Sequence, residues 1–341
     1  MKNGIEIFFQ NLGDADSIFV RTWKNDIPTN ILIDGGYRKD ADQVSTFVGE
    51  RLLETGSDQI DHLVCSHCHD DHAGGLVELV NERHFRIGQA WVRDLRGDRS
   101  VLSLSRVSQL SMSQAKLVLE KLERSEKTRI ELLEGLEKYY PDTIISEPFY
   151  GEEIGPLIVL GPTYEFFQQQ YSKFDDRAFV TQLEARYQKR NQLAASSSTE
   201  KPLGDYVSPE NEVSTILAYP FNEDGNEKVY MLTADAGREG LNDVIYRYGS
   251  ALKNVRWLQV PHHGSRRNLD EQIIAKLAPE TCFISCAGNI KHPSVKLVNK
   301  LKHYGTVYST HYCVDSNSWL RQSAGKVFNL SITPATPLYE K

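Results

Sequence analysis

The chain lacks any long run of apolar residues. None approaches the roughly 20 residues that a membrane-spanning helix needs, so no membrane anchor is expected. Its first residues show no basic segment followed by an apolar one, so no secretory signal is expected either. Only five of the 341 residues are cysteine, an odd number without paired spacing. Such cysteines are typical of buried reduced thiols rather than of a disulfide framework, and a cytoplasmic location is expected.

The chain also lacks an excess of positive charge. Its 39 Lys and Arg residues are outnumbered by 46 Asp and Glu residues, which gives a net charge of −7. This balance argues against a surface built for broad nucleic-acid binding, although a local basic groove would be compatible with it. Hydrophobic residues make up 40% of the chain and charged residues 25%, as in ordinary globular proteins.

Strand-like and helix-like segments alternate in two halves of the chain. Strand-like runs in the first half include IEIFFQNL, SIFVRTW, NILIDGG and IDHLVC, and those in the second half include VSTILAYP, KVYMLTAD, VRWLQVP and CFISCAG. Segments in which apolar residues recur with helical spacing follow or separate these runs. The order sheet, helix, sheet, helix predicts an α/β fold with two stacked sheets flanked by helices, a four-layer αββα sandwich. We expect it to form one domain over residues 1–341.

Two polar, helix-like segments interrupt this pattern, at residues 103–140 and 164–204. In the first, apolar residues recur at three- and four-residue steps between mixed charges, which predicts two helices. The second ends in the loop-like stretch LAASSSTEKPLG. We interpret both as helical insertions that shape a substrate-selecting lid or offer a docking surface to a protein partner.

The most informative stretch is SHCHDDHAGG, which directly follows a strand-like run. In a tight loop at the end of that strand, His67 and His69 can point one way while Asp71 and His72 reach a second point nearby. This is the geometry of a two-metal site, and its nitrogen and oxygen ligands suit Zn²⁺, Mn²⁺ or Fe. The next helix is expected to begin near Gly75.

The second half of the chain offers further candidates. Asp235 ends a strand-like run, and a carboxylate can bridge two ions about 3.5–4 Å apart, although a helix cap is the alternative interpretation. His262 and His263 follow an apolar run, so one could bind metal while the other contacts substrate or orients a ligand. His292 is a candidate for contact with the substrate, with a surface histidine as the alternative.

Three more residues are assigned supporting roles. Arg266 and Arg267 follow the paired histidines and would add positive potential that suits an anionic substrate, unless they face solvent. Asp34, in LIDGG, could form a plain turn, but we interpret it as an acid that steadies a metal-binding histidine.

The stretch HLVCSHCHDDHAGG resembles the HxHxDH signature of the metallo-β-lactamase superfamily, a large group of hydrolases. With NLGDADSIFV, ILIDGG, NEVSTIL, LTADAG, VPHHGS and GNIKHPS in this order, the chain is similar to hydrolase domains of the ComEC type, which are found attached to DNA-uptake channels. The similarity spans roughly residues 5–94 and 145–320 and does not include the membrane channel. It implies the metallo-β-lactamase sandwich and metal-dependent hydrolysis, with an anionic phosphodiester as the expected substrate.

The resemblance implies a set of ligands for two divalent ions, Zn²⁺ or Mn²⁺: His67, His69, Asp71, His72 and, as the bridging carboxylate, Asp235. One of His262 and His263 would be the last ligand. The pattern does not order the pair, and we take His263 as the ligand. Asp71 or Asp235 would hold the attacking water in line, and His262 or His292 would donate a proton to the leaving group.

The chain departs from the superfamily pattern at two places. Many members have a further histidine ligand before the bridging Asp, whereas the corresponding segment here reads NEVST, so one metal would be weakly held or bound only with substrate. Ala234 stands where Gly is commoner. Three hypotheses follow: a phosphodiesterase or nuclease, a hydrolase of a non-phosphate ester, thioester or amide, and a partner-dependent subunit of a multi-protein, defence-type system.

Overall fold

Both predicted sheets are present in a computed structural model. It describes residues 2–95, 112–173, 203–205, 207–223, 225–252, 255–289, 291–310, 320–321, 327–329 and 339–340. For residues 112–124, 223 and 250, and for the segments after 310, only the backbone is described. Parts of the two predicted insertions, 103–111 and 174–202, lie outside the described residues. No helix in the described part of the chain is long and apolar enough to cross a membrane.

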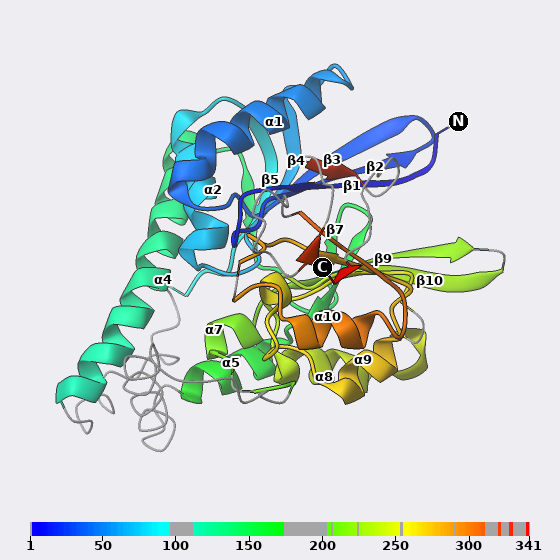
Figure 1. Ribbon diagram of the computed structural model, residues 1–341. Helices are drawn as coiled ribbons and strands as arrows, with labels where there is room; N and C mark the ends of the chain where they lie inside the picture. The colour runs from blue at the N-terminus through cyan, green and yellow to red at the C-terminus, as the bar shows by residue number, and fades with distance from the viewer. Residues whose placement is uncertain are drawn as a thin grey trace.

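The first sheet has seven strands in the order β15-β1-β2-β3-β4-β5-β6 (Figure 1). These are β1 (Gly4–Gln10), β2 (Ile18–Lys24), β3 (Ile27–Ile33), β4 (Gln59–Val64), β5 (Arg86–Trp91), β6 (Ile144–Ser146) and β15 (Val327–Asn329). Strands β1, β2 and β3 form the expected antiparallel meander, and β3, β4, β5 and β6 pair in parallel. The parallel part therefore has all its carboxyl ends at one edge.

The second sheet repeats this plan in the order β13-β12-β11-β10-β9-β8-β7. Its strands are β7 (Glu153–Ile154), β8 (Leu157–Gly161), β9 (Ile216–Glu223), β10 (Asn226–Leu232), β11 (Trp257–Gln259), β12 (Thr281–Ile284) and β13 (Thr306–Ser309). Strands β7 to β10 pair antiparallel, and β10 to β13 pair in parallel. A separate two-stranded ribbon pairs β14 (Leu320–Arg321) with β16 (Tyr339–Glu340).

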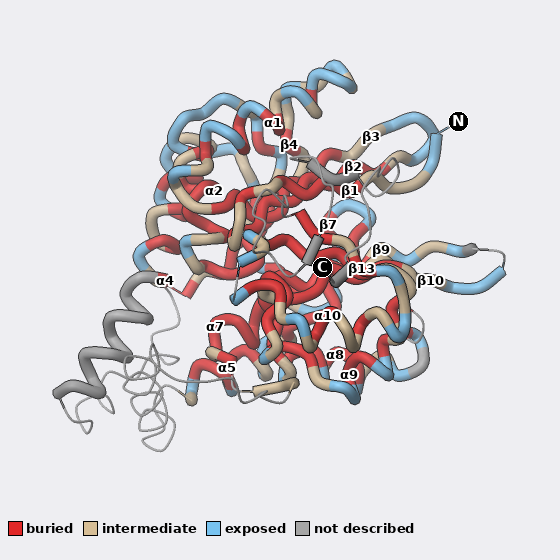
Figure 2. Tube along the Cα trace, viewed as in Figure 1, coloured by how far each residue is buried: buried red, intermediate tan, exposed pale blue. Residues whose placement is uncertain are grey.

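Helices cover the outer faces of both sheets (Figure 1). On the first lie α1 (Ala41–Leu53), α2 (Asp70–Glu82) and α4 (Met112–Tyr139), and on the second α8 (Arg238–Tyr248), α9 (Glu271–Leu277) and α10 (Val295–Leu301). Helices α5 (Tyr164–Ser172) and α7 (Pro209–Glu212) lie at the strand-end edge. Three apolar clusters fill the spaces between these layers, and Figure 2 shows the strands and inner helix faces buried. The predicted αββα sandwich is confirmed.

Aromatic side chains from both sheets meet between the sheets. The ring centroids of Phe9 and Phe283 lie 5.3 Å apart, and those of Phe9 and Trp257 lie 5.7 Å apart. Each of these rings is buried. Burial of large aromatic rings at such offsets is a main source of packing energy, so this contact fixes how the two sheets stack. It also fixes where their strand-end edges meet.

Helix α2 starts earlier than the sequence suggested. It begins at Asp70 rather than near Gly75, with His69 as the extended residue before it. Asp70 and Asp71 in the first turn suit the positive end of the helix dipole, which explains the early start. Gly75 is instead inside the helix, where an added Cβ would lie 1.8 Å from the carbonyl oxygen of Gly35. The glycine allows α2 to pack directly against the turn after β3.

The prediction of two helices in residues 103–140 is wrong for the part that is described. Residues Met112–Tyr139 form one continuous helix of 28 residues. The segment contains no proline, and its one glycine, Gly135, stands near the end, so nothing breaks the helix. Leu132, Leu133 and Leu136 are buried in the cluster beneath α2. The last turns of α4 therefore belong to the outer helix layer of the sandwich.

Candidate metal centre

Imidazole and carboxylate groups from both sheets gather at the edge where the parallel strands end. In such sheets the carboxyl ends of the strands form the usual binding crevice, because the connecting loops begin there. Asp34 directly follows β3, and the loop carrying His67 and His69 follows β4. In the second sheet, Asp235 lies after β10, and the short helix His262–Gly264 follows β11.

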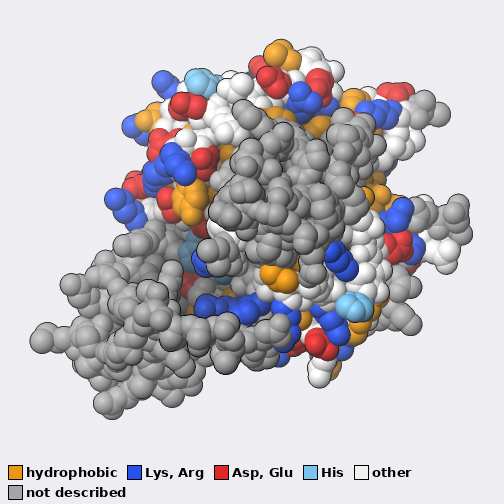
Figure 3. Space-filling view, viewed as in Figure 1, with side chains coloured by type: hydrophobic (Ala, Val, Ile, Leu, Met, Phe, Trp, Pro, Cys, Tyr) orange, Lys and Arg blue, Asp and Glu red, His pale blue; other side chains and the backbone are white. Residues whose placement is uncertain are grey.

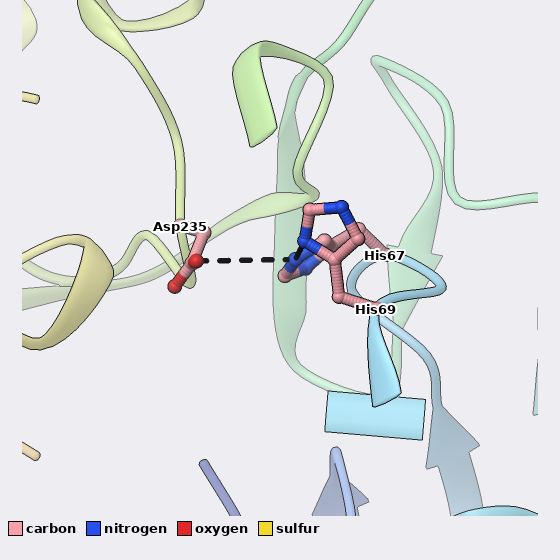
Figure 4. Close-up of side chains that lie close together, drawn as sticks. All are labelled: His67, His69 and Asp235. Carbon is pink, nitrogen blue, oxygen red and sulfur yellow. Dashed lines mark hydrogen bonds and ion pairs between the residues drawn. The ribbon is translucent and has the colours of Figure 1, made fainter. Parts of the chain in front are cut away.

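One group of candidate donors consists of His67, His69 and Asp235 (Figure 4). One donor atom from each lies within 4.8 Å of the other two. Nε2 of His67 is 3.1 Å from Nδ1 of His69 and 3.9 Å from Oδ2 of Asp235. In Figure 4 the His67 imidazole points toward the Asp235 carboxylate, and the His69 ring lies beside it.

A second group consists of Asp71, His72 and His263. Nε2 of His263 lies 3.6 Å from Oδ2 of Asp71. Nε2 of His72 lies 3.2 Å from Oδ1 of Asp235, the carboxylate of the first group. Asp235 thus presents one oxygen to each group, as a bridging carboxylate would.

Unpartnered buried atoms mark the space between these groups. Nε2 of His72, Nε2 of His263 and Oδ1 of Asp235 are buried and have no hydrogen-bond partner among the described residues. His72 and Asp235 approach to 3.2 Å but are not aligned for a hydrogen bond. A buried polar atom without a partner costs free energy, and a bound cation would satisfy all three. The donor set therefore fits divalent metal ions.

Asp34 holds one of the candidate ligands in place. Its Oδ2 lies 2.8 Å from Nδ1 of His72 and accepts from the hydroxyl of Ser66 at 2.6 Å, while Oδ1 accepts from the Ser66 backbone N–H at 2.8 Å. A carboxylate at Nδ1 places the proton there and leaves Nε2 of His72 free for a metal. The geometry favours the role that we assigned to Asp34 over a plain turn.

The carboxylates of the centre favour positive charge at two of the imidazoles. Burial disfavours the charged form of His72, but Asp235 and Asp34 outweigh it and raise the pKa of His72 well above its ordinary value. For His263, the nearby carboxylate of Asp71 and the charges of Asp235 and Asp16 likewise overcome burial and raise the pKa to about 9. A metal ion would replace these protons, since histidine binds metals in its neutral form.

The paired histidines separate in space. His263 belongs to the second donor group, and its Nδ1 lies 3.0 Å from the Ser285 carbonyl oxygen. His262 lies outside that group, with 28% of its side chain exposed and Nε2 3.6 Å from Oδ2 of Asp235. Burial of its ring lowers the pKa of His262 to about 4. The geometry thus suits His263 as the ligand and His262 as a neutral contact for substrate.

Two residues of the centre were missed by sequence reasoning. The side-chain amide of Asn211 donates to Oδ2 of Asp235 at 3.0 Å and lies 3.1 Å from Nδ1 of His262. Asp16 forms a third candidate donor group with His72 and Asp235, and its buried Oδ1 has no hydrogen-bond partner among the described residues. Asn211 comes from NEVST and Asp16 from NLGDADS. Both segments contributed to the family resemblance, but neither residue was recognised as part of the centre.

His292, Arg266 and Arg267 are close in sequence to residues of the candidate metal centre, but they differ in what they contact. His292 is buried, its ring centroid lies 5.8 Å from those of His262 and His263, and burial lowers its pKa. Arg266 forms an ion pair at 3.4 Å with Asp205, outside the donor groups, and Arg267 is exposed. Figure 3 shows a hollow near α2 and α7 in which His and Lys or Arg side chains are visible.

Strained backbone is concentrated at the strand ends that carry the centre. Ala234 has a φ of 44°, His262 53° and His263 55°, in the left-handed region that favours glycine. Asp34 has a φ of 59°. Ala234 is the position where Gly is commoner in the superfamily pattern, which the left-handed backbone explains. Conformations of this kind persist where the surrounding structure enforces them, as at functional sites.

Comparisons with known proteins match one family over part of the chain. A sequence profile described as the metallo-beta-lactamase superfamily matches residues 13–143, and no curated protein matches the chain. Among solved structures, the metallo-β-lactamase fold protein YhfI from Bacillus subtilis is 12% identical with a TM-score of 0.41, covering 96% of this chain and 100% of its own. A diphosphatase from the PhnP family is 12% identical with a TM-score of 0.38, covering 96% and 98%.

A third solved structure, the dizinc quorum-quenching lactonase AidC, is 12% identical with a TM-score of 0.35 and covers 95% of this chain and 93% of its own. Likenesses this low carry no information on the substrate. The matched profile contains the first sheet's motif, and the fold completes it with Asp235 and His263 from the second sheet. Residues 13–143 of the chain thus match the metallo-β-lactamase superfamily. The donor groups form a candidate two-metal centre of the kind that suits a metal-dependent hydrolase.

Proposed function

We propose that the protein is a metal-dependent phosphodiesterase or nuclease of the ComEC type. The proposal rests on the ordered set of sequence segments that resemble ComEC-type domains and on the composition of the donor groups. The donor groups lie at the edge where the parallel strands of the two sheets end.

The observation that carries the proposal is the make-up of the His67 group. Its candidate donors are two imidazoles and Asp235, and an amide from Asn211 contacts Asp235 where another superfamily member would offer a further imidazole. A cation held by three protein donors keeps a position open for an oxygen ligand. Anionic phosphodiester oxygens are harder donors than the neutral carbonyl of a lactam or thioester, so they would fill that position better.

Some residues of the chain would hold the cations, and others would position the water and the substrate. Divalent cations at these groups would lower the pKa of a water from 15.7 toward about 7 and offset negative charge that develops on substrate oxygens. Asp235 would fix the spacing of the two groups, and Asp71 would orient the attacking water. His262 and His292 have lowered pKa values, so they would offer neutral N–H hydrogen bonds to a phosphate or leaving oxygen.

The test is hydrolysis of bis(p-nitrophenyl) phosphate by protein loaded with Mn²⁺ or Zn²⁺, followed by single- and double-stranded nucleic acids. We expect His67→Ala to lower turnover at least about a hundredfold, because it removes a donor of the first group. His303→Ala is the matched control, since this exposed imidazole contacts only the carbonyl oxygen of Asn299 among the hydrogen bonds described. It should retain wild-type turnover.

Metal content must be measured on the same samples. Protein with metal bound that leaves every phosphodiester intact, yet cleaves a lactone or thioester, would overturn the proposal. The function would then be that of a hydrolase of non-phosphate esters or amides.

A second candidate role is that of a partner-dependent subunit. The observation that favours it is α4, whose last turns pack beneath α2 while its first half extends away from the sheets at the lower left of Figure 1. A protein docked there would sit beside the end of α2 that carries Asp71. Light scattering of the protein alone and after co-expression with neighbouring genes would test this, and a fully active monomer that captures none of their products would argue against it.

A further inference from the structure

Two buried thiols lie within the loop that carries the first donor group. Cys65 and Cys68 are 2% and 6% exposed, and their Sγ atoms are 3.8 Å apart. Cys65 directly follows β4, and its backbone N–H donates to the Trp91 carbonyl oxygen at 2.9 Å. Cys68 stands between His67 and His69 in the chain. None of the chemistry proposed above uses either sulfur.

The sulfurs are tied directly to the position of His67. The thiol of Cys65 donates to the His67 carbonyl oxygen at 3.2 Å, so the reduced form helps to hold the loop. A disulfide bond has an S–S length near 2.05 Å, which is well below the present separation of the two sulfurs. Forming it would remove the S–H donor and draw Cys68 toward Cys65, and His67 and His69 flank the residue that moves.

A small cavity of about 10 Å³ is lined by Cys65, Cys68 and His67. That volume holds about one water-sized molecule. Arg93 and Arg129 also line it, and the Nε atom of each is buried without a hydrogen-bond partner among the described residues. These two N–H groups could donate hydrogen bonds to an oxygen atom of a small polar oxidant that reaches the thiols.

We propose that Cys65 and Cys68 form a reversible disulfide when they react with a hydroperoxide, and that this bond releases metal from the centre. One sulfur attacks a peroxide oxygen, so an S–O bond forms, the O–O bond breaks and water leaves. The second sulfur then attacks the first, so the S–S bond forms, the S–O bond breaks and a second water leaves. The dithiol loses two electrons and two protons, and the hydrogen peroxide takes them up.

The inference rests on the proposed metal centre but not on the proposed substrate. Metal loss follows from geometry, because Nε2 of His67 can share an ion with His69 and Asp235 only while the loop keeps its present shape. In a reducing compartment the pair would stay as thiols, and oxidation would be a response to peroxide.

The experiment treats metal-loaded protein with hydrogen peroxide and measures three quantities. Peptide mass spectrometry should find a Cys65–Cys68 disulfide, metal analysis after gel filtration should show at least about half of the metal lost, and dithiothreitol with added metal should restore it. Cys68→Ala should keep its metal under the same treatment. Cys286→Ala, which removes another buried cysteine and leaves the pair intact, should respond as the wild type does.

The inference is overturned if no Cys65–Cys68 disulfide forms, or if it forms while the metal content stays the same. Equal metal loss from Cys68→Ala would also overturn it. If Cys68→Ala does not fold, Cys65→Ala serves the same purpose, and the wild-type disulfide map and its reversal by dithiothreitol remain decisive. Because all three readouts need no substrate, failure here is separate from failure of the phosphodiesterase proposal.

Discussion

The side-chain amide of Asn211 donates to Oδ2 of Asp235 at 3.0 Å, which joins the short helix α7 to the centre between the sheets. The hydroxyl of Ser208 accepts from the Asn211 backbone N–H and caps this helix. The contact orients one carboxylate oxygen, so Asp235 can direct the other toward His72. A hydrogen bond to a charged group contributes about 1.5–3 kcal/mol.

We therefore expect Asn211→Ala to lower kcat/KM for a phosphodiester by about tenfold or more, since about 1.4 kcal/mol corresponds to a factor of ten. The same variant should bind metal less tightly, because Asp235 would lose its fixed orientation. Steady-state kinetics and competition with a chromophoric chelator measure the two effects. Asn81→Ala, at an exposed position of α2, is the control and should change neither.

The contact between Asp34 and His72 yields a second prediction. Asp34→Asn retains the side-chain size and tolerates the φ of 59°, but it removes the negative charge next to Nδ1 of His72. We expect metal affinity to fall by about 10- to 100-fold, the usual effect of losing such a partner. Chelator competition gives the affinity. Unchanged affinity would mean that His72 does not need Asp34 to present Nε2.

Much of the fold and of the candidate centre could be predicted from short segments. His67, His69, Asp71 and His72 are close in sequence, so one loop and one helix turn bring them together whatever the rest of the chain does. The apolar runs predicted the strands of both sheets because the pattern of a strand depends only on neighbouring residues in the sequence. The start of α2 could not be read this way, since the helix dipole and the packing of Gly75 on Gly35 decide it.

The remaining parts of the centre depend on long-range packing. Asp16 lies in the β1–β2 loop and Asn211 in α7, and only the stacking of the two sheets brings them to Asp235. An isolated Asp or Asn has no local pattern that separates a donor from a turn residue or a helix cap. The single helix α4 shows the converse case. Its apolar spacing was interpreted as two helices, but its backbone contains nothing that requires a break.

The packing of α2 against the turn after β3 yields a third prediction. Gly75→Ala would place a Cβ 1.8 Å from the Gly35 carbonyl oxygen, and backbone atoms on both sides leave no flexible side chain to move. We expect a loss of more than about 3 kcal/mol in the free energy of unfolding, because overpacking here shifts a whole helix. Urea denaturation measures it.

Gly49 provides the matched control for this substitution. It lies inside α1, and an added Cβ would meet only the Phe85 ring at 3.7 Å, an ordinary contact distance. Gly49→Ala should therefore stabilise the protein by up to about 1 kcal/mol through helix propensity. If both alanine variants were equally unstable, close approach at Gly75 would not be the cause.

Glu212 makes the stability of the protein depend on pH. Burial raises the pKa of its carboxyl group to about 7, from an ordinary value of 4.5, although the backbone N–H of Gly240 donates to it at 2.9 Å. Below pH 4.5 the group is protonated in both the folded and unfolded chains and costs nothing. As pH rises through about 7, the unfolded chain is already ionised while the folded chain must give up its proton, so stability falls.

A raised pKa of this size corresponds to a cost on the order of 3 kcal/mol above pH 7, at 1.36 kcal/mol per unit. Glu212→Gln cannot ionise, and its side-chain oxygen can still accept from Gly240. We expect the variant to be more stable than the wild type at pH 8 and close to it at pH 5. Urea denaturation at both pH values measures the difference. A variant that is less stable than the wild type at pH 8 would show that the ionised carboxylate is favourable where it lies.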